Sequence, residues 1–396
     1  MLRPSPLPTF SYTSFRFSIH STGNHDNTTP QPDKMATDEP SQPRAQELPV
    51  RPKEPSSTSS SSSQQQNESQ TFDIVRTYRD LLTSDRDITM PVAAIESLIE
   101  LMRATPYYTA MELVEKVKAE KAKLIASAPN PLPILAGADL FEQYLLKSLR
   151  GQTSDTTSSD KPLSFDETRQ HLLDNRQLFA QRAKAARDNI AVWGTRYVSD
   201  GKVVLTMGGS RTVTKILLRA AQDRSKYFKV IYVHDGKPRS EKAVAELRAA
   251  DLEVETISMA KVAFVLGAQK KINLVLVGSE AITQNGGIIS GMGTAQLAAL
   301  TKSIKGGMKR FYVAAETHKI VRKTPIAYPT LQHLGIKQKD VGKFENLGVE
   351  VSQDEGLLLD EQDEVDYTEP DLIDGFITEQ GIKMAWQIWE FVDDYL

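Results

Sequence analysis

Apolar residues recur every three or four positions through the first half of the chain, beginning at Phe72. This spacing aligns them along one face of an α-helix, which can then pack against a core. Five helices are predicted on this basis, over about Phe72 to Asp85, Pro91 to Met102, Thr109 to about Ala126, Gly137 to Leu149, and about Phe165 to Trp193. A polar linker, Gly151 to Lys161, is expected between the last two.

Thr109 and Glu112 have the spacing of a capping box at the start of the third predicted helix. In a capping box the threonine hydroxyl accepts a hydrogen bond from the backbone N–H three residues later, while the glutamate carboxylate reaches back to the helix start. Both side chains are therefore expected at a helix N-terminus.

Beyond Gly194 the apolar residues form short runs that alternate with helical segments. Strands are predicted over Val203 to Met207, Val230 to Val233, Val254 to Ile257, Leu274 to Val277 and Phe311 to Ala314. Helices are predicted between them, at about Arg211 to Gln222, Ser240 to Ala250, Lys261 to Ala268 and Thr294 to Ser303. This order predicts a doubly wound parallel sheet with its ligand crevice at the carboxyl ends of the strands.

The predicted fold class is α + α/β, with a helical domain over residues 71–195 followed by a Rossmann-like α/β domain over residues 196–396. Residues 1–70 are rich in Pro, Ser and Gln without apolar periodicity, which predicts a disordered tail. Residues 353–366 form a strongly acidic insertion, interpreted as a mobile loop, with contact to a basic partner as the alternative.

Composition narrows the range of functions. The formal net charge is -3 and the isoelectric point about 6.1, which argues against direct nucleic-acid binding through phosphate neutralisation. The absence of cysteine excludes disulfides, thiolate metal sites and a cysteine nucleophile. No apolar run reaches the roughly 18 residues of a membrane-spanning helix. We therefore expect no membrane segment, no metal and no cofactor.

The first predicted strand runs into Gly208 and Gly209, and Ser210 and Arg211 follow where a helix starts. Glycines allow backbone N–H groups to approach an anion, the helix terminus adds a positive dipole, and Arg211 can pair with a phosphate. The alternative is a glycine turn in which Ser210 only caps the helix.

The fourth strand ends at Glu280, and a strand-to-helix loop rich in glycine follows it. Its carboxylate suits sugar hydroxyls, while the loop could cradle a phosphate and Thr294 could cap the next helix. The loop residues assigned to this predicted site are Asn285, Gly286, Gly287, Gly293 and Thr294. A tight crossover that packs a subunit interface is the alternative.

The fifth strand leads into Glu316, His318 and Lys319. Lys319 is predicted to complete a pocket for a sugar phosphate or nucleotide, and a solvated edge is the alternative. None of the six histidines has a second ligand at metal spacing, so His318 predicts no metal site.

Together these segments resemble the family shared by the alpha, beta and delta subunits of translation initiation factor 2B and two sugar-phosphate isomerases. The resemblance covers about residues 72 to 380 and, in order and spacing, is greatest for the alpha subunits. It rests on the segments FDIVRTYRDLLTSD, MPVAAIESLIELM, GADLFEQYLLKSL, RAKAARDNIA, GSRTV, VGSEAITQNGGIISGMGT, FYVAAETHKIVR and VDYTEPDLI.

The resemblance implies a cytosolic, non-catalytic regulatory subunit of the guanine nucleotide exchange factor for initiation factor 2. It implies a homodimer formed through the sheet domain, contact with the beta and delta subunits, and sensing of the phosphorylated alpha subunit of initiation factor 2. Thr109 and Glu112 match positions near the sensing surface.

An isomerase is the alternative function that the family allows. Its enzymes use a cysteine and an aspartate, whereas this chain lacks cysteine and carries Glu280 at the aspartate's strand end. A sugar-phosphate-binding scaffold without activity is a third interpretation. Three segments depart from the family: residues 1–70, His234 to Gly236 and Gly381 to Leu396. We expect the pocket edge and the dimer surface to differ there.

Overall fold

The computed structural model describes residues 72–85, 87–154, 176–305, 308–324, 333–338 and 364–393, with the single residues 170, 173 and 331. The predicted tail and most of the acidic insertion lie outside these ranges. Residues from Glu68 to Leu396 form one compact unit. A division into two domains near residue 195 stays a prediction.

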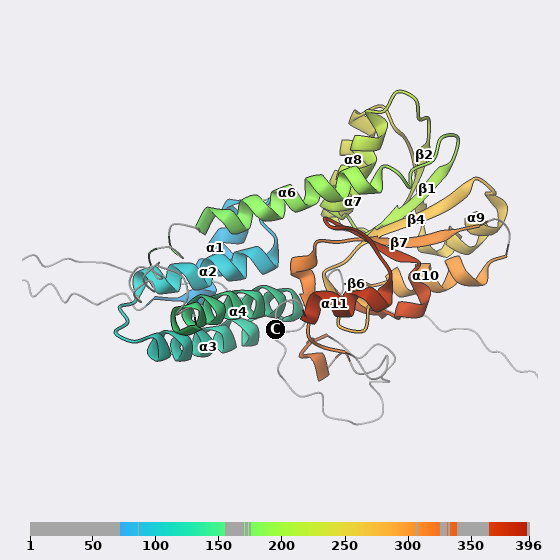
Figure 1. Ribbon diagram of the computed structural model, residues 1–396. Helices are drawn as coiled ribbons and strands as arrows, with labels where there is room; N and C mark the ends of the chain where they lie inside the picture. Colours follow the sequence, from blue (N-terminus) through green and yellow to red (C-terminus); the bar gives the residue numbers. More distant parts are fainter. Residues whose placement is uncertain are drawn as a thin grey trace, which may run out of the picture. The chain divides into compact units, whose positions relative to one another are not determined.

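Helices make up the first part of the described chain (Figure 1). They are α1 (Ile74–Ser84), α2 (Met90–Ala104), α3 (Ala110–Ala126), α4 (Leu132–Ser154) and α6 (Arg176–Gly194). Helix α2 packs against all four others and is buried along most of its length, from Pro91 to Met102. Its apolar residues form the centre of the helical core, which confirms the predicted amphipathic stripes.

Helix α4 is longer than predicted, and the predicted linker is partly wrong. Asn130 accepts a hydrogen bond from Leu132 N (3.2 Å), so the helix begins five residues before Gly137. Gly137 lies inside the helix, and close packing requires a glycine there, since a Cβ would approach the Pro91 carbonyl oxygen to 2.0 Å. Gly151 is helical as well, since one glycine weakens a helix by only about 1 kcal/mol and does not end it.

The five predicted strands are all present, in a seven-stranded sheet of order β11-β10-β7-β4-β1-β2-β3. The predicted strands are β1 (Val203–Met207), β2 (Lys229–His234), β3 (Glu253–Ser258), β4 (Ile272–Gly278) and β7 (Arg310–Ala314). Two further strands, β10 (Gly375–Thr378) and β11 (Gly381–Lys383), extend the sheet beyond β7. Only β11 pairs antiparallel, so the predicted parallel, Rossmann-like sheet is confirmed.

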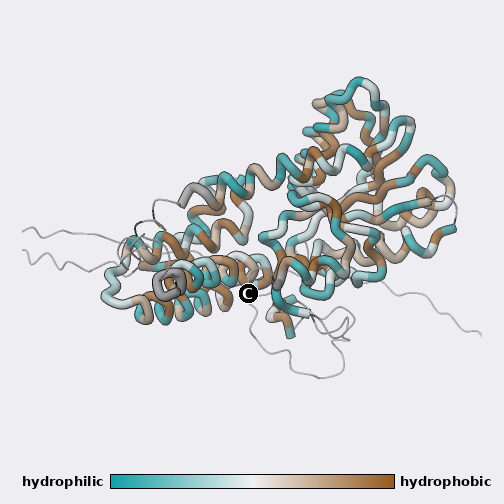
Figure 2. The backbone as a smooth tube through the Cα atoms, in the orientation of Figure 1, coloured by the Kyte–Doolittle hydropathy of each residue, from teal (hydrophilic) through white to brown (hydrophobic). Residues whose placement is uncertain are grey.

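Helices cover both faces of this sheet. They are α7 (Arg211–Ala221), α8 (Pro238–Ala249), α9 (Val262–Ala268), α10 (Thr294–Ser303) and α11 (Ile388–Asp393). Along β1, Val203 and Leu205 face one core cluster while Val204 faces the other. Burial on both faces explains why the central strands are almost continuously apolar, as the brown central strands of Figure 2 show.

A second, four-stranded sheet of order β8-β5-β6-β9 was not predicted. Its strands are β5 (Ala281–Thr283), β6 (Ile288–Gly291), β8 (Ile320–Val321) and β9 (Val365–Thr368). The prediction of one strand-to-helix loop after Glu280 is therefore wrong, because β5 and β6 form a hairpin within it. Single-turn 3₁₀ helices lie at Met259–Lys261, Thr317–Lys319, Pro370–Leu372 and Ala385–Gln387.

Candidate functional site

A cleft of 620 Å³ lies at the carboxyl ends of β1, β4 and β7. Strand order reverses between β1 and β4, so this is the topological switch point where doubly wound sheets bind ligands. The loop between α1 and α2, together with Arg187 from α6, lines the opposite side. The cleft therefore lies where the sequence predicted the ligand crevice.

The lining of the cleft is predominantly basic. Seven of its residues carry positive side chains, namely Lys184, Arg187, Arg211, Lys215, Arg239, Lys242 and Lys319. Four carry negative side chains, namely Asp87, Glu246, Glu280 and Glu316. This excess of cationic groups in a concave site favours an anionic ligand.

The turn after β1 brings backbone to the cleft as predicted. Gly208 and Gly209 have φ of +85° and +63°, values that favour glycine. Ser210 caps α7, accepting a hydrogen bond from Val213 N at 3.4 Å, and Arg211 donates to the carbonyl oxygen of Ile88 at 3.2 Å. Both Ser210 and Arg211 line the cleft.

Glu280, at the end of β4, is held by two partners from distant parts of the chain. Its Oε2 accepts a hydrogen bond from Asn130 Nδ2 at 2.9 Å, and its Oε1 lies 3.5 Å from Arg239 Nη1. Asn130 precedes α4, and Arg239 lies in α8. The carboxylate is thus fixed between the helical part and the sheet rather than left open to act on a substrate.

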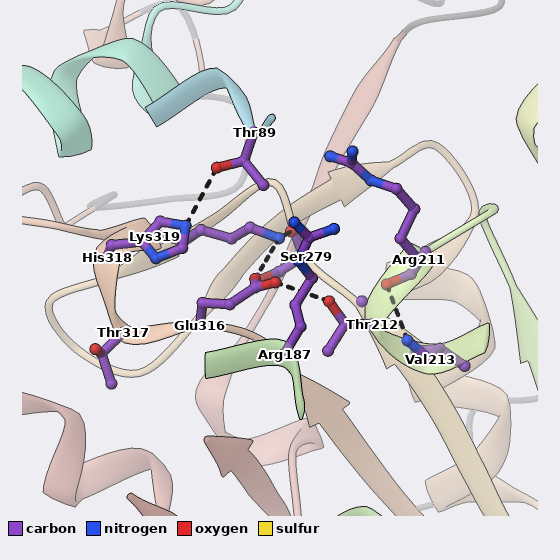
Figure 3. Close-up of polar contacts among 12 residues, drawn as sticks. Thr89, Arg187, Arg211, Thr212, Val213, Ser279, Glu316, Thr317, His318 and Lys319 are labelled. Atoms are coloured by element: carbon purple, nitrogen blue, oxygen red, sulfur yellow. Dashed lines mark hydrogen bonds and ion pairs between the residues drawn. The ribbon is translucent and has the colours of Figure 1, made fainter. Parts of the chain in front are cut away.

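Glu316 and Lys319 form a buried ion pair after β7, with Nζ and Oε2 2.8 Å apart (Figure 3). Thr212 donates to the other Glu316 oxygen at 2.8 Å, and Lys319 donates to the Ser279 carbonyl oxygen at 3.1 Å. Burial opposes ionisation of Glu316, but the charge of Lys319 and its hydrogen bond to the carboxylate outweigh burial and hold the pKa of Glu316 well below the usual range. Lys319 therefore reaches the cleft while balancing this carboxylate.

Arg187 is a cleft residue that the sequence analysis missed. It is 8% exposed, its Nη2 donates to the Asp87 carbonyl oxygen at 2.7 Å, and its Nε has no acceptor among the described residues. Arg187 belongs to the same helical face as Ala183, Ala186 and Ile190. A charged residue inside that apolar stripe was the signal that could have identified it.

His318 is enclosed beside the cleft and joins two segments. Its Nε2 lies 3.3 Å from the hydroxyl of Thr89, just before α2. Burial lowers the pKa of His318 to about 4, so the imidazole is neutral near pH 7. The described residues include no group of three or more His, Cys, Asp or Glu placed to hold a metal ion.

Three predicted site residues, Asn285, Gly286 and Gly287, lie at the tip of the β5–β6 hairpin and do not line the cleft. Asn285 donates to the Tyr367 hydroxyl at 2.9 Å. A Cβ on Gly286 would lie 2.3 Å from the Ala385 carbonyl oxygen, and one on Gly287 would lie 2.4 Å from the Tyr367 ring. Close packing accounts for these residues.

Of the two predicted site residues at the start of α10, Gly293 and Thr294, only one lines the cleft. Thr294 lines the cleft and donates to the Gly291 carbonyl oxygen at 2.6 Å. Gly293 lies outside the cleft, where its N–H and that of Ala295 donate to Asp366 Oδ2 at 2.8 and 3.0 Å. The end of the glycine-rich loop that was predicted to cradle a phosphate therefore holds a carboxylate of the same chain.

Thr109 and Glu112 lie at the N-terminus of α3. Glu112 N donates to the Thr109 hydroxyl at 3.2 Å, and the Glu112 carboxylate accepts from Tyr108 N at 3.0 Å rather than from Thr109 N. The side chains of Tyr108 and Met111 beside them are 85% and 69% exposed. The cap is thus formed next to exposed apolar surface.

Comparison with known proteins places this architecture among translation factors. A profile of the Initiation factor 2 subunit family matches residues 84–384. The chain is 28% identical to translation initiation factor eIF2B subunit alpha of Dictyostelium discoideum over 322 residues, 79% of this chain and 94% of that protein. It is 25% identical to ribose 1,5-bisphosphate isomerase of Methanocaldococcus jannaschii over 237 residues, 59% of this chain and 72% of that protein.

Among solved structures, a chain of the tetrameric eIF2B-beta2-delta2 complex from C. thermophilum has the same fold. The TM-score is 0.59 at 20% identity, covering 82% of this chain and 96% of that chain. The resemblance stated from the sequence motifs is confirmed. No helix within the described ranges is long and apolar enough to cross a bilayer.

Proposed function

The chain belongs to the Initiation factor 2 subunit family, and we propose that it is a regulatory subunit of the guanine nucleotide exchange factor for translation initiation factor 2. In this role it joins the beta and delta subunits, forms a homodimer through its sheet, and makes exchange sensitive to the phosphorylated alpha subunit of initiation factor 2. It acts in the cytosol and has no catalytic role of its own.

The observation that carries this proposal is the extent of the match to an alpha subunit, which covers 94% of that protein. Family membership supports a role in regulating translation initiation in general. The specific partners are proposed from relatives, since the C. thermophilum structure is described as a complex of beta and delta subunits.

The cleft supports binding over isomerisation. The chain contains no cysteine, and both oxygens of Glu280 are engaged by Asn130 and Arg239. Proton transfer needs a base within hydrogen-bond reach of the substrate and free to accept its proton. Because one relative is an isomerase, isomerisation of a sugar phosphate stays the alternative function. Turnover of a sugar phosphate by the purified chain tests it.

We propose further that the cleft binds a sugar phosphate or nucleotide as a ligand. Arg187, Arg211 and Lys319 supply cationic groups, and the Arg187 guanidinium has an unused buried donor. Calorimetry with sugar phosphates and nucleoside monophosphates tests this. Binding that weakens at least tenfold in Arg211→Gln supports it, and no heat in the folded wild-type protein contradicts it.

The sensing surface is proposed at the start of α3. Thr109 and Glu112 are occupied in capping, while Tyr108 and Met111 expose large apolar side chains beside them. Exposed aromatic and methionine side chains are typical of protein interfaces. Capping and partner contact are compatible, because capping engages the Thr109 hydroxyl and one Glu112 oxygen while Glu112 stays exposed.

Assembly is the first test of the proposal. The chain is mixed with purified beta and delta subunits, and the mass of the complex is measured by light scattering. We expect a larger assembly that contains two copies of the chain. A chain that stays apart from both subunits would instead be a scaffold paralogue, or an isomerase if it also converts a sugar phosphate.

A further inference from the structure

A second cavity of 540 Å³ lies at the carboxyl ends of β1 and β2, close to the end of β3. It shares only Met207 with the cleft described above. Its lining comes from the ends of β1 and β2 and the residues just after β2, from Met259 after β3, from the start of α10, and from Asp366 on β9. None of these residues has a role in the proposed function.

Three methionines line this cavity, namely Met207, Met259 and Met292. A Cβ on Gly293 would lie 2.8 Å from the Met259 methyl and 3.5 Å from that of Met207, so both methyl groups lie over Gly293. Thioethers make favourable contacts with aromatic rings and adapt to their shape. The methionine lining of the cavity therefore suits a flat aromatic group.

Asp235 supplies a carboxylate at the end of β2. Its Oδ1 accepts a hydrogen bond from Lys237 N at 3.1 Å, and the residue lines the cavity. Asp235 follows the glycine turn at Gly209 by 26 residues. In doubly wound sheets, an acidic residue near this position accepts hydrogen bonds from ribose hydroxyls.

Asp366 provides a second, independent indication of a ligand. It is 2% exposed, its Oδ2 caps α10, and its Oδ1 has no hydrogen-bond donor within the described part of the chain. A buried carboxylate oxygen without a donor is costly, and a ligand N–H or O–H would satisfy it.

The same residue argues against a phosphate in this cavity. The N-terminus of α10 is already occupied by the Asp366 carboxylate, and Asp235 adds a second acid. Lys237 also lines the cavity, but the Gly293 and Ala295 N–H groups that would bind an anion at this helix start are already engaged by Asp366.

We propose that this cavity binds a purine nucleoside without a phosphate group. The base packs against Met207, Met259 and Met292, the ribose hydroxyls donate to Asp235, and one donor of the ligand satisfies Asp366. The site lies beyond the proposed regulatory function and is separate from the anion-binding cleft.

The test is a titration of the full chain with adenosine, followed by NMR of ¹³C-labelled methionine methyl groups. The chain has ten methionines, so the signals can be resolved and assigned by substitution. We expect ring-current shifts at Met207, Met259 and Met292 and none at Met111, which is exposed on α3. Inorganic phosphate should leave the adenosine affinity unchanged.

Two variants complete the design. Asp235→Asn keeps the acceptor for Lys237 N and the size of the side chain, and should weaken adenosine binding at least tenfold. Arg211→Gln, in the cleft, should leave adenosine binding unchanged. An unmoved signal from Met102, which is buried in the helical core, shows that each variant is folded.

Three outcomes would overturn the proposal. Absence of shifts at the three methionines with millimolar adenosine would show that the cavity does not take the nucleoside. Equal affinity in Asp235→Asn would show that the carboxylate does not bind it. Loss of binding in Arg211→Gln, or on addition of phosphate, would place the nucleoside in the cleft instead.

Discussion

Asn130 Nδ2 donates a hydrogen bond to Glu280 Oε2 at 2.9 Å, joining the start of α4 to the end of β4 across 150 residues of sequence. The same asparagine accepts from Leu132 N at 3.2 Å. One side chain therefore both begins a helix and fixes the carboxylate of the cleft.

Asn130→Ala is expected to lower the free energy of unfolding by about 1 to 3 kcal/mol, because a hydrogen bond to a charged group and a helix cap are both lost. Urea denaturation measures the change. Asn130→Asp keeps the cap acceptor but places a like charge beside Glu280, so it should also destabilise the protein. A stable Asn130→Asp variant would show that the contact with Glu280 is unimportant.

Gly286 is expected to tolerate no side chain. Its φ is +82°, and a Cβ would lie 2.3 Å from the Ala385 carbonyl oxygen, so Gly286→Ala adds a backbone clash to conformational strain. We expect Gly286→Ala to lower the free energy of unfolding by roughly 2 kcal/mol or more. Gly236 is the matched control, because its φ is +72° and nothing lies within 4 Å of the added Cβ.

Gly236→Ala should therefore lower the free energy of unfolding only through backbone strain, by roughly 1 kcal/mol. Thermal unfolding of the two variants separates strain from packing. Equal losses would mean that the hairpin tip does not pack against Ala385 as described.

Asp366 is expected to make stability depend on pH. Burial raises the pKa of this carboxyl to about 7, although the Gly293 and Ala295 N–H groups and the charge of Lys237 oppose the shift. Between pH 4 and pH 7 the folded state then keeps a proton that the unfolded state has lost. The contribution of Asp366 to the free energy of unfolding should fall by about 4 kcal/mol as the pH rises through this range.

Chemical denaturation of the wild type and of Asp366→Asn at several pH values measures this term. The difference in the free energy of unfolding between wild type and Asp366→Asn should change steeply from pH 4 to pH 7 and level off above pH 7. A difference that stays constant across the range would show that the carboxyl titrates normally.

Substitutions at Thr109 and Glu112 distinguish capping of α3 from contact with a partner protein. Thr109→Ser keeps a capping hydroxyl and should leave stability within about 0.5 kcal/mol of wild type, whereas Thr109→Ala should cost about 1 kcal/mol. Glu112→Gln retains an acceptor for Tyr108 N but removes the charge. Loss of phosphorylation sensing in Glu112→Gln at unchanged stability would assign Glu112 to the contact.

The strands and most helices could be predicted because the apolar residues of each element show the spacing typical of a strand or of a helix. α10 was predicted with the bounds Thr294 to Ser303 that the structure gives, since glycines precede it and an apolar stripe fills it. The fifth predicted strand likewise matches β7, except for Arg310 at its start.

The second sheet could not be predicted in the same way. β8 has two residues and β5 three, lengths at which alternation carries no information, and β6 was hidden among glycines taken for a loop. β6 pairs with β9, which lies more than 70 residues later in the chain.

The candidate site was predicted only in part for a similar reason. Ser210, Arg211, Glu280, Thr294 and Lys319 line the cleft because each lies near the carboxyl end of a strand, a position that the sequence reveals. Arg187 and Asn130 come from the helical part, and only the tertiary structure brings Arg187 to the cleft and Asn130 to Glu280.

The most direct test of the central claim is the rate of GDP release from initiation factor 2 by the remaining exchange-factor subunits, with and without this chain. The account predicts that adding the chain makes release slow when phosphorylated factor is present, while release with unphosphorylated factor alone stays fast. An exchange rate that responds equally to phosphorylated factor with and without the chain would contradict the regulatory function.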